Sequence, residues 1–248
     1  MVQKRSLQIY ISVAVIIICS VLLYTSFEAR FNKAPKEMQL TTFKNTKHFN
    51  ISVFGEGLSE RDVQWVMWLT ERFYDRVYQW YGDHSEKEWL TVYIAKDFPE
   101  YPNTNGEMIL IPTEKVQKRE IKFILIKVAH LLTGAYKWPW HQAHIAAEGL
   151  SAYLAGKYLG NGFTYQKNLE GRANLAKLEK VKYFCWKMSS EQQEYVYDKA
   201  GAFVGYLINK NGIKKMKELY DEGGEAWEKV YGNNLADLEK EWLGRYTQ

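Results

Sequence analysis

The stretch FILIKVAHLLTGAYKWPWHQAHIAAEGLSAYLAG, residues 123–156, decides how this chain is interpreted. It holds His130, His141, His144 and Glu148 among apolar and small residues. Apolar residues at helical spacing on both sides of a glycine predict two successive helices. A carboxylate in such apolar surroundings needs a partner, because an isolated buried charge is costly. The stretch therefore predicts a polar site between two helices.

Around this stretch the sequence predicts strands first and helices afterwards. Alternating apolar residues predict strands at 48–55, 89–95 and 106–112. Helical spacing predicts a long helix that starts after Ser59, has Asp62 at the capping-box position, and ends at Gly82. Further helices are predicted at 116–133, 142–159, 165–180, 191–210, 213–222 and 235–246, with Gly134 and Gly212 as C-terminal caps. The order predicts an α+β fold, with a small sheet packed with a long helix and a mostly helical C-terminal half.

The first segment differs from the rest of the chain. LQIYISVAVIIICSVLLYTSF, residues 7–27, carries no charge. A helix over most of this run would rise about 28 Å, close to the ~30 Å hydrocarbon core of a membrane. A secretory signal peptide also has a basic start and an apolar run, but no clean small-x-small cleavage pair follows here. We therefore predict an uncleaved single-pass anchor in the cell membrane, with cleavage as the alternative.

Lysines and arginines flank both ends of the apolar run, so the positive-inside rule does not choose its orientation. The short N-terminal tail and the large remainder favour a domain outside the cytoplasm. The predicted organisation is a cytoplasmic tail and transmembrane anchor over 1–29, a linker over 30–46, and a domain over 47–248. Within that domain we expect a sheet-containing half over 47–137 and a helical half over 138–248.

Composition excludes several classes of protein. Of the 248 residues 46% are hydrophobic and 25% are charged, which is typical of a globular domain. The net charge of +4 is spread along the chain without a basic and aromatic cluster, so no nucleic-acid partner is predicted. Cys19 lies in the apolar run and Cys185 stands alone in the domain, so no disulfide forms within the domain. Cys185 is interpreted as a small core residue.

Histidine and glutamate on successive helices are the residues that zinc hydrolases use. Two histidines at i and i+4 leave one helix face and converge on one ion, and a glutamate beside the first polarises the bound water. A third ligand, often glutamate, comes from a second helix. Here Glu148 occupies such a second helix and is followed by Gly149 and Tyr153.

The segments AHLLTG, EGLSAYLAG, YDKAGAFVGYLINKNGIKKMKELY and VYGNNLADLEKEWLGRY resemble the gluzincin metallopeptidases of the peptidase-MA type, over residues 89–246. In that family His-Glu-x-x-His on one helix is followed by Glu-Gly-x-Ala-x-Tyr on the next. The resemblance implies a thermolysin-like fold. It also implies that GEMILIP is an edge strand that pairs with an extended peptide, with Glu107, Ile109 and Ile111 on one face.

Compared residue by residue, the family motif is incomplete. His130 matches the second histidine and Glu148 the glutamate ligand, but Ile126 stands at the first histidine's position. Lys127 stands at the position of the catalytic base. An ammonium is cationic at neutral pH, so it repels a metal ion and takes up no proton. The resemblance therefore implies a homologue that has lost catalysis. We expect it to bind no cofactor, and zinc is the one alternative.

Three arrangements of these residues stay open. His130 can be a core histidine bonded to Glu148, and Lys127 can face Glu148 and replace the charge of the metal. Alternatively His144, at i and i+4 with Glu148, joins His130 to make a divergent zinc peptidase, with His141 as a fourth candidate. Tyr195 and Tyr197 lie near the family's transition-state tyrosine, although packing is the more ordinary role.

The function predicted from the sequence is that of a membrane-anchored, extracytoplasmic, metallopeptidase-like pseudoenzyme in binding or regulation. Its expected partners are the membrane, through residues 7–27, and an extended peptide or an envelope protein. A structural partner in an envelope complex is a second alternative. The Trp and Tyr residues of the long helix over 60–81 would supply its contact face.

Overall fold

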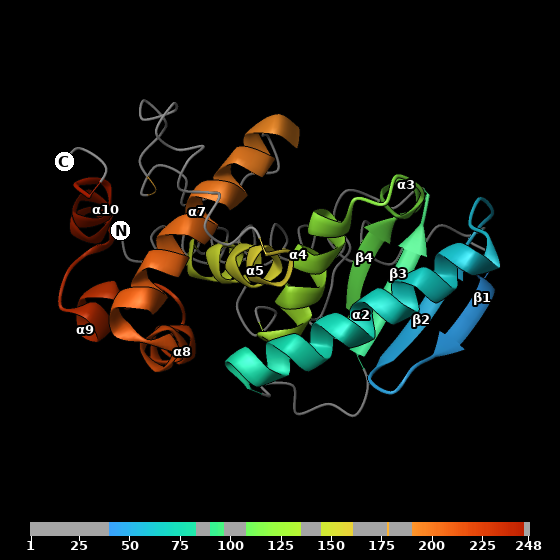
Figure 1. Cartoon of the computed structure of the whole chain (residues 1–248), viewed down its shortest axis with the longest axis horizontal. Coiled ribbons are helices and arrows are strands. Elements are labelled where there is room, and N and C mark those ends of the chain that lie inside the picture. The colour runs from blue at the N-terminus through green and yellow to red at the C-terminus, as the bar shows by residue number, and fades with distance from the viewer. Residues whose placement is uncertain are drawn as a thin grey trace, which may run out of the picture. The chain divides into compact units, whose positions relative to one another are not determined.

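A computed structural model describes residues 40–82, 90–96, 108–134, 145–160, 178 and 190–245, with side chains from 196 onward in the last range. All of these residues belong to one compact unit. The fold is mixed α+β, with a four-stranded sheet and eight helices among the described residues (Figure 1). This agrees with the predicted fold class.

The sheet has the order β1-β2-β3-β4, formed by Leu40–Asn45, Phe49–Phe54, Leu90–Ala95 and Met108–Pro112. β1 and β2 are antiparallel, whereas β2, β3 and β4 run parallel to one another. The strands β2, β3 and β4 were predicted. β1 was not predicted, because it falls in the range that the sequence analysis treats as a linker. Its register shifts between Leu40 and Thr42, so the alternation that marks a strand is broken there.

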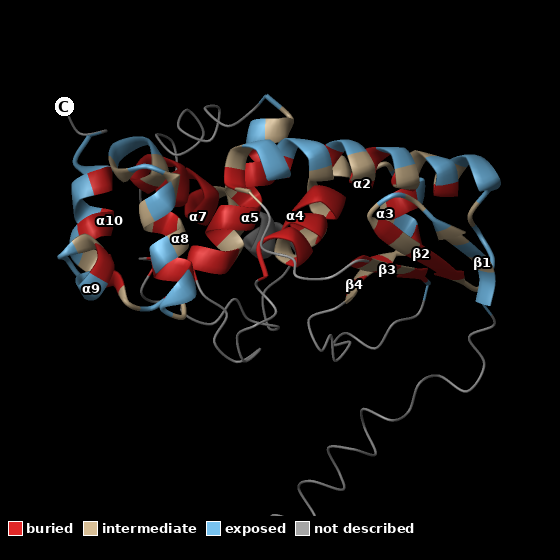
Figure 2. Cartoon of the chain, turned by 90° about the horizontal axis from the view of Figure 1, so that it is seen from below, coloured by how far each residue is buried: buried red, intermediate tan, exposed pale blue. Residues whose placement is uncertain are grey.

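One face of the sheet forms the core of its half of the molecule. Parallel register aligns buried side chains of β2, β3 and β4 in rows across the sheet: Phe49 with Leu90, Ile51 with Val92 and Ile109, and Val53 with Ile94 and Ile111. Helix α2 (Glu60–Tyr81) covers this face, and α4 (Ile121–Leu132) packs beside β4 (Figure 2). Because side chains alternate along a strand, only one face of each strand can enter this core.

The long helix α2 starts and ends where its sequence predicts. Ser59 is the N-cap: its hydroxyl accepts a hydrogen bond from the backbone of Asp62, and the Asp62 carboxylate accepts one from the backbone of Ser59. This is the capping box that the spacing predicts. Gly82 ends the helix with a φ of 82°, which lies in the left-handed region that favours glycine.

The helix predicted over 116–133 is confirmed as α4 over Ile121–Leu132, but its first residues belong to a separate short helix. α3 (Thr113–Gln117) and α4 are separated by a turn in which Arg119 adopts a φ of 55°. The left-handed conformation is costly for a residue with a Cβ. Tertiary contacts offset the cost: the Arg119 guanidinium lies 2.6 Å from Asp62 Oδ1 and 4.1 Å from the ring centroid of Trp65. Neither contact is visible in the local sequence.

The helical half contains α5 (Ile145–Tyr158), α7 (Ser190–Asn211), α8 (Ile213–Asp221), α9 (Trp227–Tyr231) and α10 (Leu235–Leu243). Helices α5, α7, α8 and α10 agree with predicted helices, whereas the five-residue α9 was not predicted. The helix predicted at 165–180 lies outside the described residues apart from Leu178, which is buried.

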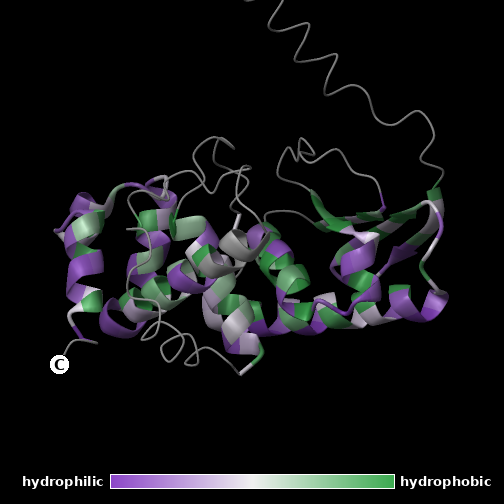
Figure 3. Cartoon of the chain, turned by 90° about the horizontal axis from the view of Figure 1, so that it is seen from above, coloured by the Kyte–Doolittle hydropathy of each residue, from purple (hydrophilic) through white to green (hydrophobic). Residues whose placement is uncertain are grey.

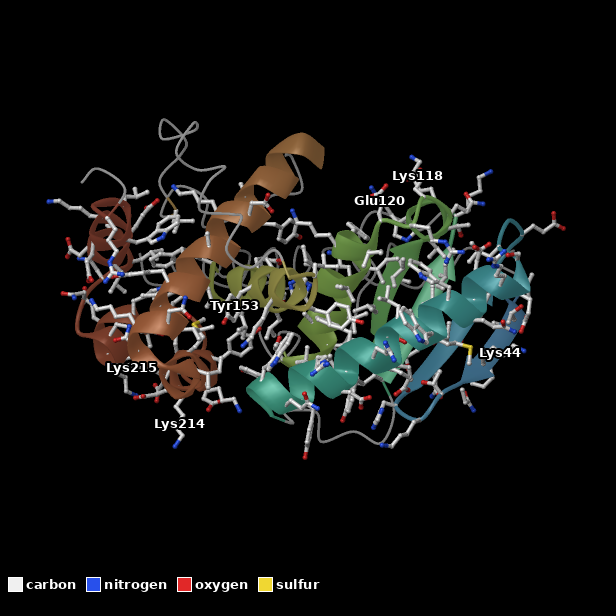
Figure 4. All side chains as sticks on the ribbon, in the orientation of Figure 1. Lys44, Lys118, Glu120, Tyr153, Lys214 and Lys215 are labelled. Atoms are coloured by element: carbon white, nitrogen blue, oxygen red, sulfur yellow. The ribbon has the colours of Figure 1, made fainter. Side chains whose placement is uncertain are left out.

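Glycines allow α5 and α7 to pack closely. A Cβ on Gly149 would lie 2.6 Å from the carbonyl oxygen of Ala200, which is closer than real Cβ atoms approach. A Cβ on Gly205 would lie 2.9 Å from the ring of Tyr153, which is labelled in Figure 4. The absence of side chains at these positions therefore sets the distance between the two helices.

No helix among the described residues is long and apolar enough to span a membrane. The apolar run over 7–27 lies outside the described residues, so the anchor stays a prediction.

Candidate functional site

An ion pair between α4 and α5 lies at the centre of the candidate site. His130 is in the last turn of α4 and Glu148 is in the first turn of α5. These are the helix ends at which a cation and an anion, respectively, are favoured by the helix dipole. His130 Nε2 lies 2.8 Å from Glu148 Oε2, and each side chain is 16% exposed. The contact is an ion pair only when His130 is protonated.

Two further side chains act on the Glu148 carboxylate. Burial works to raise the pKa of Glu148, but the charge of His130, the more distant charge of Lys127 and a hydrogen bond from Tyr197 outweigh it. The pKa of Glu148 therefore lies below its ordinary value of 4.5. Burial and the Glu148 charge raise the pKa of the Tyr197 phenol well above its ordinary value. At neutral pH the site thus holds an ionised Glu148 and a protonated Tyr197.

The positions of Ile126 and Lys127 match the incomplete motif. Ile126 is buried one helical turn before His130, so a hydrocarbon occupies the helix face that a second histidine would need. Among the described residues Glu148 forms an ion pair with His130 and not with Lys127, while the charge of Lys127 contributes to lowering the pKa of Glu148. The Lys127 ammonium instead lies 5.7 Å from the ring centroid of Phe123 and acts on Glu148 only through its charge.

The described residues do not fit a zinc centre. Among them, no group of three or more His, Cys, Asp or Glu side chains is placed to hold a metal ion. His130 and Glu148 supply two donor atoms, and protein zinc sites use at least three. The positive charge of Lys127, one turn from these donors, also disfavours a cation.

Several predicted residues fall outside what the structure describes. His141, His144 and Glu107 lie outside the described residues, and the side chain of Tyr195 does as well. The ligand set of His130, His144 and Glu148 therefore stays a hypothesis. Of the two tyrosines considered, Tyr197 is the one that the structure brings to Glu148.

The predicted peptide-binding strand lies at one end of the sheet. Among the described strands β4 pairs only with β3, which leaves its second edge without a strand partner in that part of the chain. Ile109 and Ile111 point into the core, while Met108 and Leu110 are half-buried on the opposite face. This alternation is the one that the sequence predicts.

Sequence analysis missed polar contacts that hold the helices of the site in place. Lys122 on α4 pairs with Asp198 on α7, with 2.5 Å between Nζ and Oδ1. At the C-terminal end of α4, the Thr133 hydroxyl lies 3.0 Å from the Tyr220 hydroxyl of α8. These partners are 76 and 87 residues apart in the chain, so no local pattern indicates them.

A third contact joins α7 to α10. Lys199 and Glu239 form a buried ion pair with 2.5 Å between Nζ and Oε1. One signal was available in the sequence: Lys199 directly precedes the apolar and small residues AGAFVGYL. A charged residue at the start of such a buried run requires a partner.

No family model matches this chain, and no curated protein sequence is significantly similar to it.

Proposed function

We propose that this chain is a membrane-anchored, extracytoplasmic domain with a gluzincin-like arrangement that has lost peptidase chemistry and acts in binding or regulation. The 2.8 Å pair between His130 and Glu148 carries the proposal. The two side chains that match metal ligands of the family contact each other, and a buried isoleucine stands where the next ligand would be. Their contacting atoms are thus occupied by each other.

Among the described side chains around His130, none is well suited to act as a general base. Hydrolysis of a peptide by metal-bound water needs a group that accepts a proton near neutral pH. Lys127 is a cation, and Tyr197 is held in its protonated form by burial and by the Glu148 charge. Glu148 is a weakened base, because its pKa is lowered. Lys127, Tyr197 and Glu148 are therefore poor candidates for accepting a proton from a water molecule near neutral pH.

An extended peptide is the class of ligand that the proposal assigns to β4. A strand edge presents backbone donors and acceptors that an added strand can pair with. Amide hydrogen exchange of the full chain with an array of extended peptides is the direct measurement. Slower exchange at Met108–Pro112, with no change at β1, would support the assignment.

A different observation favours a structural role in an envelope complex. Trp68 and Tyr78 are exposed large aromatic side chains on α2, and the Arg72 guanidinium lies 5.1 Å from the Trp68 ring centroid. Exposed Trp, Tyr and Arg side chains are the types that dominate the energetics of protein interfaces. This role becomes the better proposal if β4 binds no extended peptide.

Zinc content of the purified chain tests the loss of the metal site. We expect the wild-type chain to purify without stoichiometric zinc and to gain no thermal stability from added zinc. The double variant Ile126→His/Lys127→Glu should bind zinc and be stabilised by it, because binding to the folded state adds to stability by mass action. Its matched control adds Glu148→Gln, which removes a ligand and should abolish the gain.

The opposite result is equally specific. Stoichiometric zinc in the wild type that is lost on changing His130, His144 or Glu148 to alanine would replace this proposal with the divergent zinc peptidase. Failure of the double variant to bind zinc would show that the three positions do not converge, and would weaken the gluzincin-like arrangement itself.

A further inference from the structure

The face of the sheet opposite α2 carries a group of apolar side chains among Asn50, Ser52 and Thr91, and no described helix covers it (Figures 2 and 3). Phe54 and Tyr93 are half-buried on this face, with ring centroids 5.4 Å apart. Leu110 lies beside Tyr93 in the register of the strands. On β1, Phe43 is 52% exposed and Leu40 is 49% exposed. We call Leu40, Phe43, Phe54, Tyr93 and Leu110 the open sheet face.

An irregularity in β1 places both exposed residues on this face. Leu40 and Phe43 are three positions apart, so in a regular strand they would point to opposite sides. Leu40 pairs with Phe54 and Phe43 pairs with Ser52, and the register shift between Leu40 and Thr42 makes both pairings compatible. Paired residues of antiparallel strands point to the same side, so both side chains join the open sheet face.

The Thr41 hydroxyl fixes this irregularity in place. Its oxygen lies 3.0 Å from the carbonyl oxygen of Val53 and 2.9 Å from that of Gly55. The hydroxyl thereby provides a donor to backbone carbonyls where the regular ladder is interrupted. Hydrogen bonds from Thr41 thus stabilise the bulge in β1. The bulge enlarges the apolar area of the open sheet face.

The described charges around this face are of both signs, because Glu56, in the turn after β2, is exposed. The four strands contain no Asp or Glu, and their single charged residue, Lys44, points to the other side and pairs with Glu60 at 3.1 Å (labelled in Figure 4). Lys47 and Lys96, in turns that adjoin the strands, are exposed. The two lysines can contact anionic lipid headgroups, and the exposed Leu40 and Phe43 suit the interfacial region of a bilayer.

We propose that the open sheet face rests on the anionic membrane surface in which the chain is anchored. This inference rests on the anchor of the proposed function. Leu40 follows Phe27, the end of the apolar run, by 13 residues. A tether of that length reaches no more than about 45 Å at ~3.5 Å per residue, so β1 stays near the lipid surface. The contact would give the domain a defined orientation, with α2 directed away from the membrane.

Quenching by lipids tests this orientation in the full chain. The chain is reconstituted at one copy per nanodisc, with anionic lipids and with nitroxide-labelled lipids. A fluorophore is attached to the variant Phe43→Cys or Leu40→Cys in a Cys19→Ser/Cys185→Ser background. The matched control is Trp68→Cys on α2, because Trp68 and Phe43 are both 52% exposed.

We expect strong nitroxide quenching at positions 40 and 43 and little at position 68, since an interfacial face lies within about 10 Å of the acyl boundary. Replacing the anionic lipids with zwitterionic ones should reduce the quenching at positions 40 and 43. The two β1 variants are independent, and both positions are exposed at a sheet edge, so a folding defect in one leaves the other informative.

Labelling native Cys19 in a Cys185→Ser chain separates the two proposals. Quenching at Cys19 with equal, weak quenching at positions 43 and 68 overturns the orientation and leaves the anchor intact. No quenching at Cys19 overturns the anchor itself. Protection of position 43 from aqueous iodide without nitroxide quenching shows that another part of the chain covers the face, and also overturns the inference.

Discussion

Two pairs of oppositely chargeable side chains in this molecule lie in different settings. Lys199 and Glu239 are 5% and 4% exposed, and Glu239 also accepts a 2.8 Å hydrogen bond from the backbone of Leu178. His130 and Glu148 are each 16% exposed, with 2.8 Å between Nε2 and Oε2. The first pair is fully enclosed, whereas the second lies where two helix ends meet.

The difference shows what each pair contributes. The Lys199–Glu239 pair is enclosed and also bonded to the backbone of Leu178, so it is a fixed part of the contact between α7 and α10. His130 carries a charge only when it is protonated, and Glu148 is also influenced by Lys127 and Tyr197. The Lys199–Glu239 pair thus joins two helices. The Glu148 carboxylate, by contrast, is shared by His130, Lys127 and Tyr197. Variants of each can test this distinction.

The largest effect is expected at the enclosed pair. Lys199→Met leaves Glu239 charged and buried without its cation, which costs about 3–5 kcal/mol in the free energy of unfolding. Denaturant titration of the purified chain measures the loss. The double variant Lys199→Met/Glu239→Leu should recover most of it, because apolar side chains can replace a buried pair. Equal instability of the single and double variants would mean that the pair itself is not what matters here.

A smaller effect is expected next to the His130–Glu148 pair, at the contact between α5 and α7. Gly149→Ala would place a Cβ 2.6 Å from both the Ala200 carbonyl oxygen and Val204 Cγ2, so the helices must separate. Overpacking of this kind costs about 1–3 kcal/mol. The matched control is Gly244→Ala, because a Cβ there lies 3.4 Å from its nearest neighbour. Similar melting temperatures for the two variants would contradict the close packing.

The smallest effect, and the one that depends on pH, is expected for Glu148→Gln. At neutral pH the free energy of unfolding of the variant should be lower by about 1 kcal/mol, the typical net contribution of one such contact. Because folding lowers the pKa of Glu148, its stabilisation is present above the unfolded pKa and is lost as pH falls through the lowered value, below 4.5. The gap between wild type and variant should therefore close in acid.

Thermal unfolding at neutral and acidic pH measures this gap. The control is Glu56→Gln, since Glu56 is an exposed glutamate on the same domain. A gap that stays constant with pH would show that Glu148 contributes shape and not charge.

Much of the fold was predictable because it follows from local patterns. The capping box at Ser59 and the cap at Gly82 gave the limits of α2, and alternation gave β2, β3 and β4. The break at Arg119 was not predictable, because contacts with Asp62 and Trp65 stabilise it and both are distant in the chain. β1 was missed because its bulge interrupts the alternation that would have marked it.

The candidate site was predictable in part for a similar reason. The pairing of His130 with Glu148 was one of the arrangements considered, since a carboxylate on a buried helix needs a partner. The contact of the Lys127 ammonium with the Phe123 ring was not predicted, because a flexible lysine side chain can adopt several positions on a helix. The role of Tyr197 depends on how α7 crosses α5, which the spacing of residues within each helix does not determine.

The packing of Gly149 limits how this sequence can diverge. The Ala200 carbonyl oxygen fills the place of any side chain at position 149, so a substitution there is opposed by packing whether or not the neighbouring site has a chemical role. Position 148 has no such steric limit, since its side chain points toward His130. Related sequences should therefore keep the glycine more strictly than the glutamate before it. Helix packing alone therefore explains Gly149, one of the two residues in the Glu-Gly pair that resembles the gluzincin motif.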